Sequence, residues 1–253
     1  MNQVEKAKQF AALHVKGSPV LLYNAWDAGS AKAIADAGAK AIATSSWSVA
    51  AAQGYEDGED VPTDVVDAIA GRIAAAVDLP VTIDFEGGYS DDDAVLAENV
   101  GRLLSLGVIG INFEDRVVKA DGLYSVDRQA GRIAAIRAAA DKAGVPFFIN
   151  ARTDLFLGRG APNPADSVDA ALARAAAYAG AGASGFFIPG LQDEALIGRI
   201  AETASLPVNV MVMNGVPSIA RLAQIGVARI SWGPIPYIEA VGALGAAARK
   251  VFV

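Results

Sequence analysis

Carboxylates gather at the ends of two short apolar segments of this chain. One segment ends in Ile-Asp84-Phe-Glu86, and the other ends in Asn-Phe-Glu114-Asp115. Apolar runs of this length are typical of buried parallel strands, where a carboxylate must be paired, protonated or bound to a cation. Mg²⁺ binds carboxylate oxygens and otherwise keeps waters and substrate oxygens, so it suits acids that arrive from neighbouring strands. The pattern predicts a metal-assisted enzyme.

The sequence around these acids favours a metal site over a purely structural cluster. A Gly-Gly pair follows Glu86 and would let the backbone turn sharply beside an ion. Because side chains alternate along a strand, Asp84 and Glu86 are expected on the same side. Asp57, in an acidic loop, would supply a fourth, outer carboxylate, although a solvated loop is the alternative for it. The alternative for Asp84, Glu86 and Glu114 is a salt-bridge or capping cluster.

An arginine and two serines follow other apolar segments. Arg152 is expected to point into the pocket, where its planar guanidinium would bind a carboxylate or phosphonate. It could equally pair with Glu114, and both interactions could hold together. Ser45 and Ser46, with their backbone N–H groups, could form an anion cradle before Trp47, although serines at a strand end are also common turn formers.

Three other patterns in the sequence are not interpreted as functional sites. The glycines of 180–185 match a dinucleotide-binding fingerprint, but they follow a helix and precede a strand, the reverse of the required context. His14 is the only histidine, so a catalytic triad or a histidine-rich zinc site is not expected. The acidic run at 90–93 is explained by capping of a helix N-terminus.

Composition limits the class of protein. Hydrophobic residues make up 53% of the 253-residue chain, but many are alanine, and no run approaches the roughly 18 apolar residues of a membrane span. The chain start lacks an apolar signal core, and without cysteine there are no disulfides or thiolate nucleophiles, so a cytoplasmic location is expected. A net charge of −7 argues against nucleic acid or anionic membrane as partner and favours a small molecule.

Apolar runs alternate with alanine-rich stretches of helical period along the whole chain. Several expected helices end on Gly-Ala or Ala-Gly, which is typical of a C-cap. Eight such units in about 250 residues predict one domain, a (β/α)8 TIM barrel over 1–253. The expected strands are 20–26, 41–47, 81–86, 109–115, 147–154, 185–189, 208–212 and 228–233, and the expected helices are 29–38, 63–77, 92–106, 126–143, 164–181, 192–203, 217–225 and 235–250.

The polar residues converge on one end of this predicted barrel. Active sites of such barrels lie at the carboxyl ends of the strands, where the strand-to-helix loops gather. The first five expected strands all end in polar residues, whereas the helix-to-strand connections at the other end of the barrel carry nothing comparable. The predicted substrate-binding residues are Asn24, Trp26, Asp27, Trp47, Arg152 and Asn209.

Four motifs, in this order, resemble the isocitrate lyase and phosphoenolpyruvate mutase superfamily: Asn-Ala-Trp-Asp-Ala-Gly-Ser-Ala, Ile-Asp-Phe-Glu-Gly-Gly-Tyr, Gly-Ile-Asn-Phe-Glu-Asp and Ile-Asn-Ala-Arg-Thr-Asp. The resemblance covers nearly the whole chain. It implies that Arg152 binds a substrate carboxylate and that Ser45, Ser46 and Trp47 cradle the oxyanion of a 2-oxo acid. The metal ligands that it implies, for Mg²⁺ or Mn²⁺, are Asp84, Glu86, Glu114 and Asp57.

The resemblance also implies a chemistry and an assembly. Members form or consume a pyruvate-like enolate held on Mg²⁺ while a C–C or P–C bond breaks beside it. Members usually form homotetramers and exchange a C-terminal helix between subunits. A homo-oligomer, dimer or tetramer, with a swapped C-terminal helix is therefore expected.

Two departures from the family pattern decide between reactions. The lyases carry a Lys-Lys-Cys-Gly-His type loop whose cysteine is the acid/base, whereas this chain has no cysteine, and Lys119, Asp121 or Tyr124 would have to replace it unless the loop is only a shortened lid. The mutase-like members often carry a histidine at the end of the sixth strand, where 186–190 has none.

The favoured prediction is therefore a Mg²⁺-dependent C–C lyase or decarboxylase acting on a small 2-oxo or 2-hydroxy acid. The alternatives are a P–C bond enzyme of the phosphonopyruvate hydrolase or mutase type and a degenerate protein that only binds a 2-oxo acid. Catalytic roles are predicted for Arg152, Ser45, Ser46 and Lys119.

Overall fold

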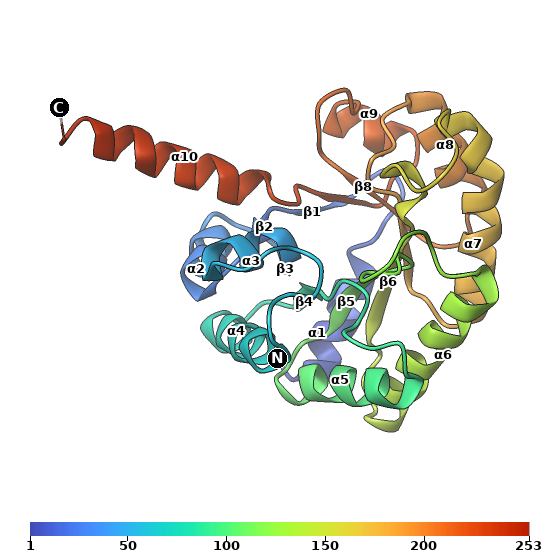
Figure 1. Cartoon of the computed structure of the whole chain (residues 1–253), viewed down its shortest axis with the longest axis horizontal. Coiled ribbons are helices and arrows are strands. Elements are labelled where there is room, and N and C mark those ends of the chain that lie inside the picture. Colours follow the sequence, from blue (N-terminus) through green and yellow to red (C-terminus); the bar gives the residue numbers. More distant parts are fainter. Residues whose placement is uncertain (253) are drawn as a thin grey trace.

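Short parallel strands form a nearly closed barrel with helices on its outside (Figure 1). The computed structural model describes residues 1–252. Each strand pairs in parallel with its neighbours, in the order β1-β9-β8-β7-β6-β5-β4-β3-β2. The strands are β1 (Val20–Leu22), β2 (Asn24–Ala25), β3 (Ile42–Thr44), β4 (Val81–Asp84), β5 (Gly110–Glu114), β6 (Phe148–Arg152), β7 (Gly185–Phe187), β8 (Val208–Met211) and β9 (Arg229–Ser231).

The first expected strand is divided in two, which gives nine strands where eight were predicted. Tyr23 alone separates β1 from β2. Val20 of β1 lies opposite Arg229 of β9, whereas Asn24 of β2 lies opposite Ala43 of β3. The segment that contains both strands therefore links the two ends of the sheet, as the first strand of a TIM-like barrel must.

The eight predicted helices are present, and two further helices were not predicted. The helix α1 precedes the barrel and begins with a capping box in which Asn2 and Glu5 bond each other's backbone N–H. The helix α3 begins at Ser46, inside a segment predicted as strand end and loop. The helices are α1 (Gln3–Ala12), α2 (Ala28–Asp36), α3 (Ser46–Gln53), α4 (Thr63–Ala76), α5 (Asp93–Ser105), α6 (Val126–Lys142), α7 (Val168–Gly180), α8 (Glu194–Thr203), α9 (Ile219–Gln224) and α10 (Ile235–Arg249), with short 3₁₀ turns at Asp154–Phe156 and Pro164–Ser167.

The barrel interior is polar, while the apolar core lies between the strands and the helices. Inside the barrel, Asn150 donates from Nδ2 to Oδ1 of Asn112 at 2.9 Å and to Oδ1 of Asn209 at 3.1 Å. Asn209 is fully buried there and its amide also donates to Ser231. Because these amides bond one another, they fix the relative rotation of β5, β6 and β8 beneath the site.

The last helix, α10, projects away from the barrel as an arm (Figure 1). Pro236 is its only buried residue, and several large apolar side chains along it are exposed, among them Leu244 at 69%. Within the described part of the chain, no helix combines the length and apolar composition needed to cross a membrane.

Candidate active site

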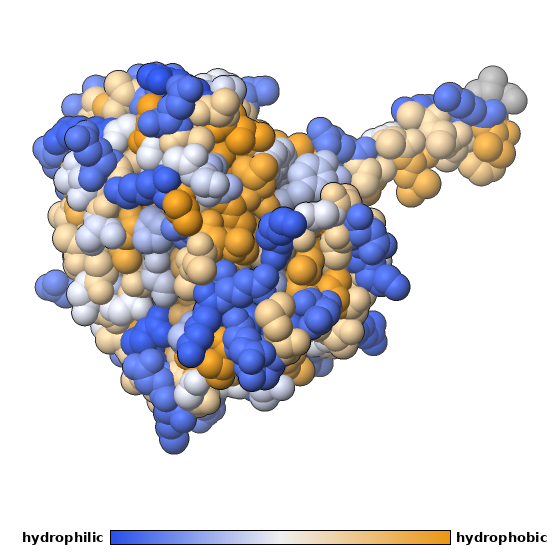
Figure 2. All heavy atoms as spheres, turned by 180° about the vertical axis from the view of Figure 1, so that it is seen from behind, coloured by the Kyte–Doolittle hydropathy of each residue, from blue (hydrophilic) through white to orange (hydrophobic). Residues whose placement is uncertain are grey.

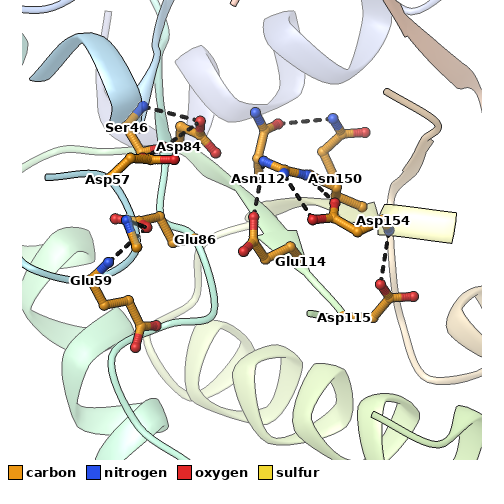
Figure 3. A network of polar contacts seen from close by, with 12 residues as sticks. Ser46, Asp57, Glu59, Asp84, Glu86, Asn112, Glu114, Asp115, Asn150 and Asp154 are labelled. Carbon is orange, nitrogen blue, oxygen red and sulfur yellow. Dashed lines mark hydrogen bonds and ion pairs between the residues drawn. The ribbon is translucent and has the colours of Figure 1, made fainter. Parts of the chain in front are cut away.

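Asp84 ends β4 with one carboxylate oxygen satisfied and the other left without a partner. Its Oδ2 accepts hydrogen bonds from the backbone N–H and the hydroxyl of Ser46, both at 3.1 Å (Figure 3). Its backbone N–H donates to the Thr44 hydroxyl at 2.9 Å, which ties β4 to β3. Its Oδ1 is buried and has no hydrogen-bond partner in residues 1–252. A buried carboxylate oxygen of this kind is an available ligand for a cation.

Asp57 and Glu86 bring further negative charge to this point (Figure 3). The Ser46 hydroxyl lies 3.0 Å from Asp57 Oδ1, so it links Asp57 to Asp84. Burial, followed by the charge of Asp84, raises the pKa of Asp57. Burial, followed by the charges of Asp57 and Asp84, raises the pKa of Glu86 to about 7. The charge of Asp84 therefore disfavours ionisation of Asp57 and Glu86, and a cation beside these acids would relieve this repulsion.

Glu86 is held by the loops around it. Its Oε2 accepts from the backbone N–H groups of Gly58 and Glu59 at 2.8 Å each, and its Oε1 accepts from the Tyr89 hydroxyl at 3.1 Å. Glu86 and Tyr89 both have positive φ angles, 49° and 62°, which are unfavourable for residues with side chains. The hydrogen bonds to Glu86 hold this strained turn in place.

Arg152, on β6, forms ion pairs with two acids. Its Nη1 lies 2.9 Å from Glu114 Oε2, and its Nε lies 2.6 Å from Asp154 Oδ1, with Nη2 donating to Asp154 Oδ2 at 3.1 Å. Burial raises the pKa of Glu114, and the charge of Arg152 opposes that shift. A guanidinium has five N–H donors, so these three contacts leave two for another acceptor. The predicted pairing of Arg152 with Glu114 is present, and it leaves donors for a substrate carboxylate.

Asp115 supports this group from behind. It is fully buried, and its Oδ1 accepts from the backbone N–H of Asp154 at 3.0 Å (Figure 3). Its Oδ2 accepts from Arg174 at 3.0 Å and from the Tyr178 hydroxyl at 2.9 Å. Both of its oxygens therefore have protein donors, which is the arrangement of a structural acid.

Asp84 and Arg152 face a common cavity of about 140 Å³ at the carboxyl ends of the strands. Asp57 also lines it, whereas Glu86 and Glu114 do not. The cavity combines two aspartates, a guanidinium and apolar walls, a combination that suits a small acid bound with a cation. The lining residues are Asn24, Ser45, Ser46, Trp47, Asp57, Asp84, Asn112, Arg152, Leu157, Phe187, Pro189, Met211, Ser231, Gly233 and Pro234.

The donors present fit Mg²⁺ through Asp84. In the described residues, no three His, Cys, Asp or Glu side chains form a group that could hold a metal ion. Mg²⁺ needs only one or two carboxylates, because waters and substrate oxygens complete its shell. Asp84 has the unpartnered oxygen, and Asp57 lies beside it. Glu86 and Glu114 already accept hydrogen bonds or an ion pair, so they would act through water.

The two serines use their backbone N–H groups within the protein. Ser45 donates to the Ala25 carbonyl at 3.3 Å, and Ser46 donates to Asp84. Neither N–H is left for the predicted oxyanion cradle, because both residues start α3 and are bonded to the neighbouring strands. The N-terminus of α3, with Trp47 beside it, still borders the cavity and favours negative charge there.

Three predicted substrate-binding residues follow the divided first strand. Asn24 lines the cavity, but its Nδ2 donates to a carbonyl of β3 at 2.7 Å and its Oδ1 accepts from two backbone N–H groups after β9. Asp27 caps α2 by accepting from the Ser30 N–H at 2.7 Å. Trp26 packs edge-on against Tyr237. Neither Asp27 nor Trp26 lines the cavity, and the same is true of Asn209 inside the barrel.

Lys119 lies at a different cavity. That cavity, of about 250 Å³, is also lined by Arg116, Tyr124 and Arg132 and shares no lining residue with the first. Asp121, on the same loop, is paired with Arg159 at 3.8 Å. The structure therefore does not bring Lys119 to Asp84, and its catalytic role stays a prediction.

Several lining residues were not predicted, and one of them is polar and central. Asn112 lies opposite Asp84 across β4 and β5, two residues before Glu114. The sequence did contain a signal for Asn112. It is a polar residue in an apolar strand, and alternation along the strand places its side chain on the same face as that of Glu114. Leu157, Phe187 and Met211 form apolar walls and carry no comparable signal, because apolar residues at strand ends are common.

Comparison with known proteins finds both a matching family model and similar solved structures. Residues 10–252 match the family model described as phosphoenolpyruvate phosphomutase. A crystal structure from Burkholderia cenocepacia J2315, of a protein provisionally named a phosphonomutase, is similar with a TM-score of 0.95 and 48% sequence identity, covering 98% of this chain and 99% of that chain.

Two curated proteins extend the comparison. An uncharacterized protein of Mycobacterium tuberculosis H37Rv is 35% identical over 242 residues, which cover 96% of this chain and 88% of that protein. The oxaloacetate decarboxylase of Pseudomonas aeruginosa PAO1 is 33% identical over 182 residues, which cover 68% of this chain and 59% of that enzyme.

Proposed function

The chain belongs to the phosphoenolpyruvate mutase and isocitrate lyase superfamily, and we propose on that basis that it is a Mg²⁺-dependent enzyme for a small 2-oxo or 2-hydroxy acid. The proposed reaction breaks a C–C bond through an enolate, as a lyase or a decarboxylase does. One observation carries the proposal. A cavity of about 140 Å³ is lined by both Asp84, which keeps one carboxylate oxygen without a partner, and Arg152, which keeps unused donors.

Each of these residues has a role in the proposed reaction. Mg²⁺ held by Asp84 would supply positive charge beside the oxygen on which negative charge develops. Arg152 binds the substrate carboxylate with its two unused N–H groups, while Glu114 and Asp154 hold the guanidinium in place. The apolar walls at Leu157 and Phe187 exclude water from the reacting acid.

A P–C bond enzyme is the second candidate. It is favoured by the family description and by the name given to the Burkholderia protein. Against it, the cavity residues at the end of β7 and just after it are Phe187 and Pro189, and neither side chain can donate or accept a proton. C–C cleavage is supported by the similarity to oxaloacetate decarboxylase, and relatives in the family also include a 2-methylisocitrate lyase.

A mass-spectrometric screen with Mg²⁺ separates these candidates. We expect C–C cleavage products, such as pyruvate, from a panel of oxaloacetate and substituted malates. Release of phosphate or phosphoenolpyruvate from phosphonopyruvate would instead establish the P–C enzyme. If ligands bind and no product forms across the panel, the protein is a binding protein and the enzymatic proposal is wrong.

We also propose that α10 packs against a second copy of the chain. Its exposed apolar side chains include Ile238, Val241 and Leu244. An apolar groove of about 880 Å³ lies near its root, lined by residues of β1, α2 and the segment after α1, with Lys40 at one edge. Figure 2 shows apolar side chains both in a hollow of the barrel beside the arm and along the arm itself. The α10 helix of a second copy is the occupant that we assign to this groove.

A further inference from the structure

The amide of Asn112 can have only one orientation. Its Oδ1 lies 2.9 Å from Nη2 of Arg229 and 2.9 Å from Nδ2 of Asn150. A guanidinium has donors and no acceptor, so the atom that Arg229 contacts must be the amide oxygen. The hydrogen bonds run in the same donor-to-acceptor direction further along the barrel interior, because Asn150 also donates to Asn209 and Asn209 donates to Ser231.

This orientation turns the amide nitrogen of Asn112 toward the cavity. Asn112 lines the cavity, and its Nδ2 donates to no acceptor in residues 1–252. Figure 3 shows the amide between Asp84 and Asn150, with its oxygen on the side of Asn150. Asp84, an acceptor, and Asn112, with its free N–H₂ donor, therefore line the same cavity.

Arg229 reaches this amide from within the barrel. It begins β9, is 1% exposed, and forms no ion pair with a carboxylate of the described residues. Its Nε and Nη1 have no hydrogen-bond partner, and its guanidinium carbon lies 5.7 Å from the centre of the Phe10 ring. A buried cation without an ion pair is unfavourable. Its side-chain hydrogen bond to Asn112 is therefore the contact that a function would have to explain.

We propose that Asn112 donates a hydrogen bond from Nδ2 to the bound acid and that Arg229 is the positioning residue that fixes this donor. The proposal rests on the proposed function, because it takes the ligand to be a small acid bound between Asp84 and Arg152. It also predicts which ligands the site selects. The ligand atom beside Asn112 must accept a hydrogen bond. A 2-oxo or carboxylate oxygen meets this requirement, and the ammonium group of a 2-amino acid does not.

Oxalate binding with Mg²⁺, measured by calorimetry, tests the donor without requiring turnover. Oxalate is a planar dianion that offers only acceptors. Asn112→Asp keeps the size of the side chain and can pair with Arg229, so the fold is retained, but it replaces the donor with a charged acceptor. We expect it to weaken oxalate binding at least 100-fold, and we expect Asn112→Ala to weaken it about 10-fold, the effect of one hydrogen bond.

A double-mutant cycle tests the role of Arg229. If Arg229 acts through Asn112, Arg229→Met weakens oxalate binding about as much as Asn112→Ala, and the double variant is no weaker than either. Arg137→Met is the matched control. Arg137 is a partly buried arginine that donates to the Gly182 and Phe147 carbonyls and does not line the cavity. This control is expected to bind oxalate as the wild-type protein does.

Several results would overturn the inference. They are equal oxalate binding by wild type and Asn112→Asp, no oxalate binding by the wild type, or fully additive effects of the Asn112 and Arg229 changes. The proposed function fails in a different way, namely by oxalate binding without turnover of any acid in the product screen.

Discussion

At the scale of single residues, hydrogen-bond partners distinguish acids of the same type. Asp84 and Asp115 both stand at the ends of strands, where Asp84 is half-buried and Asp115 is fully buried. Asp115 has protein donors on both oxygens, whereas Asp84 has donors on one oxygen only. The unpaired oxygen of Asp84 is therefore available to a ligand, and Asp115 is part of the scaffold that holds Arg174 and the turn at Asp154.

Replacing these two acids should affect stability to very different extents. Asp115→Ala leaves the partly buried Arg174 without its ion pair, so we expect it to lower the free energy of unfolding by about 3–5 kcal/mol. Asp84→Asn keeps the shape of the side chain and removes both repulsion with Asp57 and Glu86 and attraction to Arg152 and Arg229, so it should change the free energy of unfolding by less than about 1 kcal/mol. Urea denaturation measures both changes, and a large loss in Asp84→Asn would contradict this assignment.

His14 should make stability depend on pH. Its Nδ1 donates to the Phe10 carbonyl at 2.8 Å, its Nε2 is buried without a partner, and its ring stacks on Phe148 at 4.1 Å. Burial, followed by the charge of Arg229, lowers the pKa of His14 from 6.5 to about 3. The unfolded chain therefore binds a proton that the folded protein excludes as pH falls below 6.5, and folded-state stability is lost on acidification.

The expected size of the His14 contribution is about 2 kcal/mol between pH 7 and pH 4.5. The measurement is the difference in unfolding free energy between wild type and His14→Phe at each pH, because other acids contribute equally to both proteins. As pH falls, the unfolding free energy of His14→Phe should increase relative to that of the wild type. A difference that is the same at both pH values would show that His14 is not held neutral.

At the scale of elements, the turn after β4 positions the site. Gly88 has a φ of +86°, and a Cβ there would lie 2.3 Å from Leu96 Cδ1 and 3.0 Å from the Phe113 ring. The turn therefore lies directly against α5 and β5, and the Asn99 side chain fixes it by donating to the Gly88 carbonyl at 2.9 Å. Close packing of this turn holds Glu86 against Gly58 and Glu59.

Two alanine substitutions separate backbone strain from crowding. Gly107 has a similar φ of +88°, but a Cβ there has nothing within 4 Å. We expect Gly107→Ala to cost about 1 kcal/mol of stability through backbone strain alone. Gly88→Ala should cost about 2–4 kcal/mol, because overpacking against α5 is added to the same strain. Thermal unfolding of both variants checks this, and equal losses would show that the turn is loosely packed.

The sequence allowed most of the elements to be predicted, and the exceptions have physical causes. Hydrophobic periodicity located the strands and eight helices, since burial dominates both patterns. It did not separate β1 from β2, because that break depends on pairing with β9 and β3. The helix α1 lies before the first strand, where its start is marked by the Asn2 and Glu5 capping box and not by the alternation of strands and helices. At the site, Asp84 and Arg152 both line the cavity because both stand at the carboxyl ends of strands, and their roles stay predictions. The orientation of Asn112 depends on Arg229, which is 117 residues away.

At the scale of the whole molecule, the arm and the groove beside its root are both apolar. The helix α10 exposes apolar side chains, with Leu244 69% and Ile238 51% exposed, and the groove beside its root is apolar. Exposed apolar area of this kind is typical of an interface between subunits. Since the arm leaves from the end of β9, near the cavity residues Gly233 and Pro234, assembly would also stabilise one wall of the site.

Changing the arm should therefore change the assembly. We expect Leu244→Glu to shift the protein from an oligomer to a monomer in size-exclusion chromatography with light scattering, because it places a charge in an apolar groove. Arg249→Gln is the control, since Arg249 is an exposed residue of the same helix that does not line the groove, and the change removes no apolar area. A wild-type protein that is monomeric, or a Leu244→Glu variant with the wild-type mass, would contradict the packing proposed for α10.

The central claim is that turnover of a small acid depends on Mg²⁺ and on Asp84. The most direct test measures product formation from the best acid of the screen, with Mg²⁺ and with chelator, in wild type, Asp84→Asn and Asp60→Asn. Asp60 is an acid of the neighbouring loop that does not line the cavity. We predict activity in wild type and Asp60→Asn that chelation abolishes, and at least a 1000-fold loss in Asp84→Asn, as expected when charge stabilisation is removed (about 4 kcal/mol). Turnover that survives both chelation and Asp84→Asn would contradict the account.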